Sequence, residues 1–158
     1  RERYMDATQL TVRDVMETNF ISLRKDMDIY EAIALIIDKG LMGAPVVENN
    51  MIVGVFSEKD CFRVLSNWTF QMSNPTGGTV EQYMTQEVLT VDAGTSLASV
   101  VSKFLSEFYR GLPVEENGRL VGLISRRDIL KTMMRIENGK RTLQYPDSKY
   151  GSQIPGLS

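Results

Sequence analysis

Two short polar motifs of the same pattern could bind a ligand: Ser57-Glu58-Lys59-Asp60 and Ser125-Arg126-Arg127-Asp128. Each is placed where a strand should end and a helix begin, so unpaired backbone N–H groups and the partial positive charge of a helix N-terminus would lie beside it. The serine hydroxyl can donate to a phosphate oxygen, and an ionised aspartate can accept from two neighbouring hydroxyl groups. A ribose with free 2′ and 3′ hydroxyls and an attached phosphate suits this chemistry.

A purely structural interpretation of the motif stays open. Serine followed three residues later by an acidic residue resembles a capping box, and such boxes begin many helices that bind nothing. The recurrence of the motif adds little, because a duplicated fold also duplicates its helix caps. The choice between a cap and a binding site therefore depends on the surrounding residues.

Both motifs belong to an internal repeat. Residues 11–65 and 79–133 superpose at a constant offset of 68 positions without a gap, and the 55 pairs include twelve identities. Ordinary composition would give roughly three identities by chance. The repeat indicates two copies of one structural unit, and it directs the search for function to the region between the copies.

The apolar pattern of the first copy predicts alternating strands and helices. Asp28 is a plausible helix cap, Gly40 a helix stop, and Asn49-Asn50 a tight turn between two strands. The predicted elements are a strand over 20–23, a helix over 29–39, a strand from Pro45 through Val47, a strand over 51–56 and a helix from Ser57. The second copy repeats this plan over 88–134.

This order predicts an α+β fold with pseudo-two-fold symmetry. The helices of one copy cannot cover both faces of its three-stranded sheet, so the two sheets should pack together with the helices outside. A unit of about 55 residues is marginal alone, and the two copies are therefore expected to share a core.

The expected boundaries follow from composition. They are a first repeat with its N-terminal segment over 1–66, a linker over 67–78, a second repeat over 79–135 and a polar C-terminal tail over 136–158. Trp68 and Phe70 are anchors that could pack on the module, whereas the tail should be extended or disordered.

Composition excludes several kinds of function. A formal net charge of −2 gives no overall attraction for nucleic acid or an acidic membrane surface. The chain has no histidine and one cysteine, Cys61, so no zinc site and no Cys–His or Ser–His nucleophile can be assembled within it. Cys61 itself is expected to be buried. No signal peptide or membrane-spanning stretch is visible, and the cytoplasm is the expected compartment.

The rest of the repeat supplies a more specific combination of residues. Gly43-x-Pro45-Val46 and Gly111-x-Pro113-Val114 each precede a turn, a hydrophobic strand with a central glycine, and Ser-x-x-Asp. Over residues 11–134 this combination closely resembles the tandem cystathionine-β-synthase-type, or CBS, domain pair. The resemblance implies a regulatory module of two β-α-β-β-α repeats with two clefts, which often bind AMP, ADP, ATP or S-adenosylmethionine. It also implies flat homodimers formed through the helices.

The resemblance assigns roles to individual residues. In the family, the aspartate of Ser/Thr-x-x-Asp holds the ribose hydroxyls, the Ser or Thr lies near phosphate, and the first strand of the opposite repeat usually lines the base pocket. The residues implied for the favoured cleft are Asp128, Ser125, Arg127, Arg126, Ile124, Leu123, Arg110, Phe20, Ile21 and Ser22. Those implied for the second cleft are Asp60, Ser57, Lys59, Phe56, Val88, Leu89 and Thr90.

The two sites are not equally equipped to bind an anion. Arg110 of the second copy replaces Met42 of the first, and Arg126-Arg127 replaces Glu58-Lys59. A guanidinium matches phosphate in a forked geometry and keeps its charge at neutral pH. The alternative is that these arginines are ordinary solvated surface charges. We favour the site at Asp128.

The leading hypothesis is a non-catalytic sensor that binds an adenosine-containing ligand between the repeats and acts on an unidentified partner protein. The alternative is a ligand-free dimerisation or interaction scaffold in which Ser-x-x-Asp only caps helices. An enzyme is the poorest hypothesis, because the chain lacks a nucleophile–base pair, a metal cluster and a phosphate-binding glycine loop. Neither nucleic-acid binding nor membrane insertion is expected, and no cofactor is required.

Overall fold

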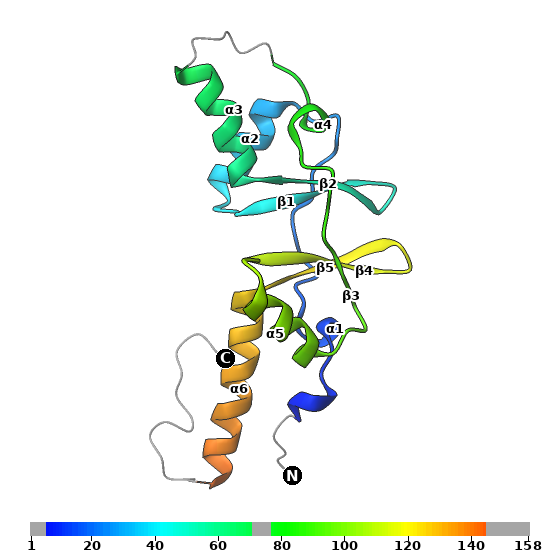
Figure 1. Ribbon diagram of the computed structural model, residues 1–158, viewed down its shortest axis with the longest axis vertical. Helices are drawn as coiled ribbons and strands as arrows, with labels where there is room; N and C mark the ends of the chain where they lie inside the picture. Colours follow the sequence, from blue (N-terminus) through cyan, green and yellow to red (C-terminus); the bar gives the residue numbers. More distant parts are fainter. Residues whose placement is uncertain (1–5, 71–76, 145–158) are drawn as a thin grey trace. The chain divides into compact units, whose positions relative to one another are not determined.

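The computed structural model describes residues 6–70 and 77–144 of the chain (Figure 1). Helices and strands alternate in it, which confirms the predicted α+β class. The elements are the 3-10 helix η1 (Ala7–Gln9), α1 (Val12–Val15), α2 (Ile29–Asp38), β1 (Gly43–Glu48), β2 (Met51–Ser57), α3 (Glu58–Phe70), α4 (Val80–Tyr83), β3 (Val91–Asp92), α5 (Leu97–Ser106), β4 (Gly111–Glu116), β5 (Arg119–Ser125) and α6 (Arg126–Gln144).

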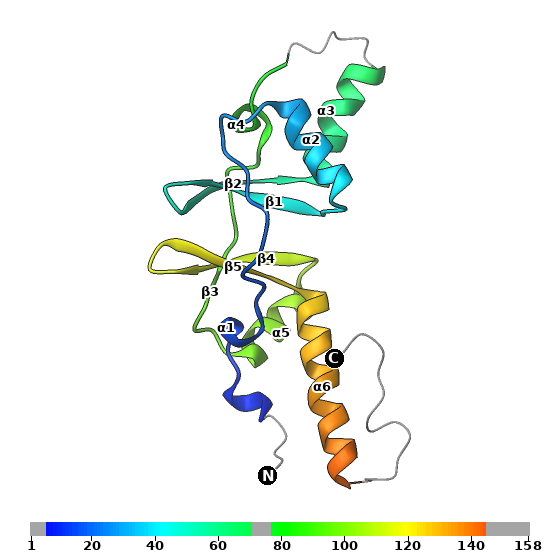
Figure 2. The same cartoon turned by 180° about the vertical axis from the view of Figure 1, so that it is seen from behind.

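The chain forms two compact units, which we name after the aspartate that each contains. The Asp60 unit comprises residues 19–70, 77–90 and 117–120, and the Asp128 unit comprises residues 6–18, 91–116 and 121–144. In the Asp60 unit α2, α3 and α4 lie on one face of the β1–β2 hairpin, and in the Asp128 unit α1, α5 and α6 lie on one face of the β4–β5 hairpin (Figures 1 and 2).

Each unit contains a short helix that the sequence places at the start of the other repeat. Helix α1 belongs to the Asp128 unit and α4 to the Asp60 unit. The backbone of Thr85, just after α4, exchanges two hydrogen bonds of 2.9 Å with Val55 of β2. Glu17, just after α1, exchanges bonds of 2.7 and 2.9 Å with Leu123 of β5. The compact units therefore differ from the sequence repeats by this exchange of segments.

The glycine at the centre of β2 and of β5 makes room for the exchanged segment. A Cβ atom on Gly54 would lie 2.5 Å from the sulfur of Met84 and 3.0 Å from the carbonyl oxygen of Thr85. A Cβ on Gly122 would lie 2.7 Å from the sulfur of Met16 and 3.0 Å from the carbonyl oxygen of Glu17. The methionine and the glycine that recur in both copies thus contact each other in each unit.

Local sequence signals correctly predicted helix α2 and the β1–β2 hairpin of the Asp60 unit. Asp28 accepts hydrogen bonds from the backbone N–H groups of Tyr30 and Glu31 at the start of α2, and Gly40 follows this helix with a φ of +62°. Asn49 and Asn50 both have positive φ at the turn between β1 and β2, as the predicted tight hairpin requires. These predictions are confirmed.

The first strand predicted for each copy is much shorter than expected. Leu23 makes only an isolated parallel bridge to Val46, and β3 holds two residues, Val91 and Asp92, parallel to β4. Glu17 is paired with β5 of one unit and Leu23 with β1 of the other. The residues between them pass from unit to unit and have no strand to follow, so a strand over 20–23 does not form.

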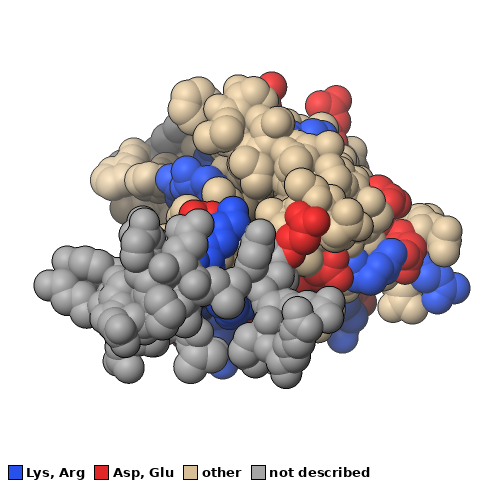
Figure 3. Space-filling model, turned by 90° about the horizontal axis from the view of Figure 1, so that it is seen from below, with Lys and Arg blue, Asp and Glu red and all other residues tan. Residues whose placement is uncertain are grey.

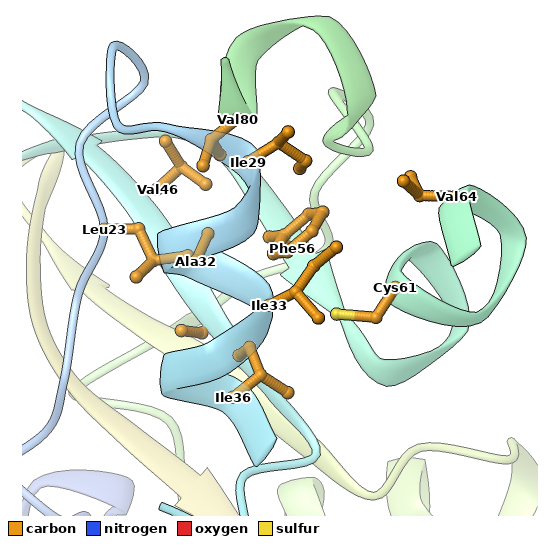
Figure 4. Close-up of a cluster of buried hydrophobic side chains, with 11 residues drawn as sticks. Leu23, Ile29, Ala32, Ile33, Ile36, Val46, Phe56, Cys61, Val64 and Val80 are labelled. Carbon is orange, nitrogen blue, oxygen red and sulfur yellow. The ribbon is translucent and has the colours of Figure 1, made fainter. Parts of the chain in front are cut away.

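The buried hydrophobic residues among those described form two clusters, one in each unit. Figure 4 shows the cluster of the Asp60 unit, in which Phe56 of β2 lies next to Ile33 of α2, and Val64 and Cys61 extend from α3. Val80 of α4 contributes to this cluster, and Val12 of α1 contributes to the other. Because each core borrows a segment from the other repeat, neither repeat completes its core alone.

The linker and the tail begin later than composition suggested. Helix α3 includes Trp68, whose ring centroid lies 4.9 Å from that of Tyr30 and 6.5 Å from that of Tyr83, so its expected packing is confirmed. Phe70 is 80% exposed and was wrongly expected to pack. Helix α6 continues to Gln144 where a tail was expected from 136, because Ile136 is still buried in it. Residues 71–76 and 145–158 of the predicted linker and tail lie outside the described residues.

The face of the molecule drawn in Figure 3 shows no dominant charge among its described residues. On the face in Figure 3, basic and acidic side chains lie interspersed among neutral ones, in keeping with the small net charge. Within the described ranges, no helix is long and apolar enough to span a bilayer. The same residues contain no group of three or more His, Cys, Asp or Glu side chains that could hold a metal ion.

Cys61 lies in the core of the Asp60 unit, 6% exposed, as predicted. Burial, with the neighbouring Asp60 carboxylate, raises the pKa of this thiol from 9.0 to about 11. Because only the thiolate is a nucleophile, native Cys61 should react with a disulfide reagent at pH 8 about a hundredfold more slowly than in the unfolded chain. Equal rates in buffer and in urea would contradict this prediction.

The same shift makes stability depend on pH in the alkaline range. The folded state favours the neutral thiol, so its contribution is complete below pH 9.0 and is lost as the pH rises through about 11. We expect the free energy of unfolding to fall over this window, and to fall less in Cys61→Ala, as measured by urea unfolding at each pH.

Candidate functional site

Both Ser-x-x-Asp motifs form complete helix caps. The backbone N–H and the hydroxyl of Ser125 donate to Oδ2 of Asp128 at 2.9 and 2.8 Å, and the Asp128 N–H donates to Ser125 Oγ at 3.2 Å. The matching distances at Ser57 and Asp60 are 2.9, 3.0 and 3.2 Å. The capping interpretation is therefore correct for both copies, and any binding must use atoms that the caps leave available.

Two strands position each motif. Ser125 ends β5, α6 begins at Arg126, and the Arg126 N–H donates to the carbonyl oxygen of Arg110 at 3.2 Å. A Cβ on Gly111 of β4 would lie 3.2 Å from the carbonyl oxygen of Ile124. The repeated glycine of Gly-x-Pro-Val thus allows β4 to approach the turn that carries the motif.

The carboxylate of Asp60 is fully engaged within its own unit. The residue is 2% exposed, and its Oδ1 accepts from Arg63 Nη1 at 2.9 Å and from Thr85 Oγ1 at 3.2 Å. Its Oδ2 accepts the two cap bonds from Ser57 and lies 3.4 Å from Thr85 Oγ1. Arg63 follows on α3, whereas Thr85 comes from the exchanged segment.

The carboxylate of Asp128 is more open. The residue is half-buried, and its Oδ2 carries both cap bonds from Ser125. The hydrogen bonds that the described residues donate to this side chain both reach Oδ2, not Oδ1. The positions matching Arg63 and Thr85 are occupied here by Lys131 and Glu17. An ionised carboxylate has about four acceptor sites, so Asp128 can still accept from a ligand.

Three arginines surround the start of α6. Arg110, Arg126 and Arg127 are exposed, and the hydrogen bond between the backbones of the first two brings these residues side by side. Two of them occupy the first turn of the helix, where a positive charge opposes the helix dipole and does not help the helix to form. An anion bound there would remove this conflict. The matching residues of the first copy are Met42, Glu58 and Lys59, also exposed.

The remaining predicted residues take different places. Ile124 and Phe56 are fully buried core residues, so they could offer a ligand only their backbone. Leu123 is half-buried and paired through its backbone with Glu17. Phe20, Ile21 and Ser22 belong to the Asp60 unit, whereas Asp128 belongs to the other unit, so their role at the Asp128 site stays a prediction. Val88, Leu89 and Thr90 share the Asp60 unit with Asp60.

From the sequence no role was predicted for Arg63 or Thr85, whose side chains donate hydrogen bonds to Oδ1 of Asp60. The signal was present in the same offset comparison that singled out Arg110, since it pairs Arg63 with Lys131 and Thr85 with Glu17. Thr85 lies 25 residues after Asp60, however, and only the fold shows that the two side chains meet.

The chain is a tandem repeat of two α+β units. The units exchange their first helices, and each carries a Ser-x-x-Asp helix cap. The sequence profile of the CBS domain matches residues 12–67 and 80–135. The chain belongs to the CBS domain family, and the resemblance stated from its motifs is confirmed.

Solved structures and curated sequences include similar proteins. CBSX2 of Arabidopsis thaliana, solved in complex with AMP, has a TM-score of 0.70 and 27% sequence identity over 80% of this chain and 98% of that one. A protein of Methanocaldococcus jannaschii is 31% identical over 131 residues, which are 82% of this chain and 45% of that protein. Inosine-5′-monophosphate dehydrogenase of Staphylococcus haemolyticus is 32% identical over 120 residues, 73% of this chain and 23% of the enzyme. The chain thus spans less than half of these two curated relatives.

Proposed function

We propose that this chain is a non-catalytic regulatory module that binds an adenosine-containing ligand of the AMP, ADP or ATP class at the Ser125–Asp128 turn. In this proposal Asp128 accepts from the ribose hydroxyls, Ser125 holds the Asp128 carboxylate in place through the cap bonds, and the arginines at the start of α6 attract the ligand's phosphates. The similarity to CBSX2, which binds AMP, supports the ligand class.

The observation that carries the proposal is the difference between the two aspartates. Asp128 keeps Oδ1 available beside three arginines, whereas both oxygens of Asp60 are held by Arg63, Thr85 and Ser57. A helix cap needs only one carboxylate oxygen, as Asp128 itself illustrates. Helix capping alone therefore does not explain why the available Oδ1 of Asp128 lies near Arg110, Arg126 and Arg127.

Binding would regulate a partner only under a further condition. A ligand shifts an equilibrium between two arrangements of a protein by the difference in its affinity for them. The proposed role in a larger assembly therefore requires a ligand that binds one arrangement of the chain more tightly than another. Homodimerisation through the helices belongs to the same proposal.

Thermal unfolding against AMP, ADP, ATP, NAD and S-adenosylmethionine tests the proposed function. A ligand at 100 times its dissociation constant adds about 2.7 kcal/mol to the free energy of unfolding. For a chain of this size the melting temperature should rise by about 5 °C or more with the true ligand. No rise with any adenosine compound would contradict the proposal.

A second candidate function is a dimerisation scaffold that binds no ligand. Large apolar side chains lie exposed on the helices of both units, which favours contact with another protein surface. They include Ile37 (64% exposed), Phe62 (74%), Leu130 (60%), Met133 (41%) and Met134 (44%).

The variant Ser125→Ala separates the two functions. It removes a cap hydroxyl and should lower the free energy of unfolding by about 1 kcal/mol in either case. A scaffold would show only this loss in urea unfolding. A sensor would in addition lose part of its stabilisation by nucleotide, measured on the same sample with and without AMP.

A further inference from the structure

The first Ser-x-x-Asp motif is built differently from the second in its side chains. We infer that Arg63 and Thr85 convert it into an internal latch, which fastens the exchanged segment after α4 to the start of α3 and closes Asp60 to ligands. Of the two Ser-x-x-Asp motifs, only the one at Asp128 then stays open to a ligand. The assignment of the ligand site to Asp128 rests on the proposed function, whereas the latch does not.

The latch joins three separate parts of the Asp60 unit at one carboxylate. Ser57 ends β2, Arg63 lies on α3, and Thr85 belongs to the exchanged segment. Arg63 also neutralises Asp60 through an ion pair of 2.9 Å. With the carboxylate 2% exposed and both oxygens in use, a ribose could bind only by displacing Thr85 or Arg63.

The backbone of the two units is the same at this place. Thr85 pairs with Val55 in one unit, as Glu17 pairs with Leu123 in the other, and both pairs stand at equivalent positions of the repeat. The difference therefore lies in the side chains. A threonine hydroxyl donates to a carboxylate, but an ionised glutamate only accepts, so Glu17 cannot close Asp128 in this way.

The positions equivalent to the latch supply matched controls. Asp60→Asn and Thr85→Val remove its charge and its hydroxyl with little change of shape, and Asp128→Asn and Glu17→Gln are the same kinds of change in the other unit. Without nucleotide, we expect each latch variant to lower the melting temperature by about 3 °C or more and each control to lower it by less than half as much.

The double variant tests whether the two residues act together. Asp60→Asn with Thr85→Val should lower the melting temperature by clearly less than the sum of the single effects, because the second change removes a bond already lost. Strictly additive effects, or equal losses at Asp60 and Asp128, would overturn the latch. This readout involves no ligand, so it decides the question even if the chain binds no nucleotide.

The latch can also be transferred to the other unit. Glu17→Thr with Lys131→Arg places both latch residues around Asp128. We expect this variant to melt higher than the wild type without nucleotide, and to bind AMP about tenfold or more weakly by calorimetry. An unchanged AMP affinity together with an unchanged melting temperature would overturn the assignment of these residues. If the wild type itself does not bind AMP, the proposed function fails while the melting comparison still tests the latch.

Discussion

Asp128→Asn is expected to weaken AMP binding by about a hundredfold. The change keeps an acceptor for the Ser125 cap but removes the negative charge and one of the two carboxylate oxygens. Each hydrogen bond to a charged group contributes about 1.5–3 kcal/mol, and the ribose would lose two such bonds. Titration calorimetry of the wild type and the variant measures the ratio of dissociation constants.

The matched control for this experiment is Asp60→Asn. It makes the same chemical change in a carboxylate that Arg63 and Thr85 already occupy. At a temperature where circular dichroism shows the variant folded, its AMP affinity should stay within about twofold of the wild type. Equal loss of affinity in both variants, or no loss in Asp128→Asn, would rule out the proposed site.

Gly54→Val is expected to lower the free energy of unfolding by about 2–4 kcal/mol. The new side chain would meet the sulfur of Met84, which can move, and the carbonyl oxygen of Thr85, which accepts a hydrogen bond from the Val55 N–H and cannot move freely. The exchanged segment would have to leave β2. Urea unfolding, monitored by circular dichroism, gives the difference in stability.

Gly122→Val should have a similar effect in the other unit, because its Cβ meets the sulfur of Met16 and the carbonyl oxygen of Glu17. Gly94→Ala is the control, since its Cβ would meet only a carboxylate oxygen of Asp92, at 3.1 Å. We expect this control to change the free energy of unfolding by less than about 0.5 kcal/mol. Equal stability of Gly54→Val and Gly94→Ala would show that the exchanged segment does not pack as described.

The parts of the fold that follow from local chemistry could be predicted from the sequence. The Asp28 cap, the Gly40 stop and the Asn49-Asn50 turn depend on residues adjacent in the chain, and the structure has all of them. The family resemblance depended on the same kind of feature, a fixed spacing of glycine, proline, serine and aspartate in both copies.

The exchange of α1 and α4 could not be predicted in this way. Both segments begin with a threonine capping box and end with a methionine, so either would satisfy the local pattern of either unit. Charge distinguishes them: Arg13 of α1 pairs with Glu116, whereas Glu81 of α4 lies 3.6 Å from Lys25. The partners in each pair are far apart in the sequence. The opposite charges of Arg13 and Glu81, which stand at equivalent positions of the repeat, show which unit each helix prefers only once these pairs are known.

The candidate site was predicted in part. The replacement of Met42 by Arg110 and of Glu58-Lys59 by Arg126-Arg127 was visible in the sequence and favoured Asp128. The closure of Asp60 was not, because it depends on a hydroxyl from the exchanged segment. Burial of Phe56 and Ile124 also required the structure, since an apolar residue beside a polar motif suits a ligand pocket and a core equally well.

The most direct test of the Asp128 site compares AMP with 2′-deoxy-AMP on the wild-type chain by equilibrium dialysis. If the Asp128 carboxylate accepts from the ribose, loss of the 2′-hydroxyl should weaken binding by about tenfold or more, and Asp128→Asn should bind the two nucleotides equally. Tight binding of both nucleotides with the same dissociation constant in the wild type would contradict the proposed recognition of the ribose.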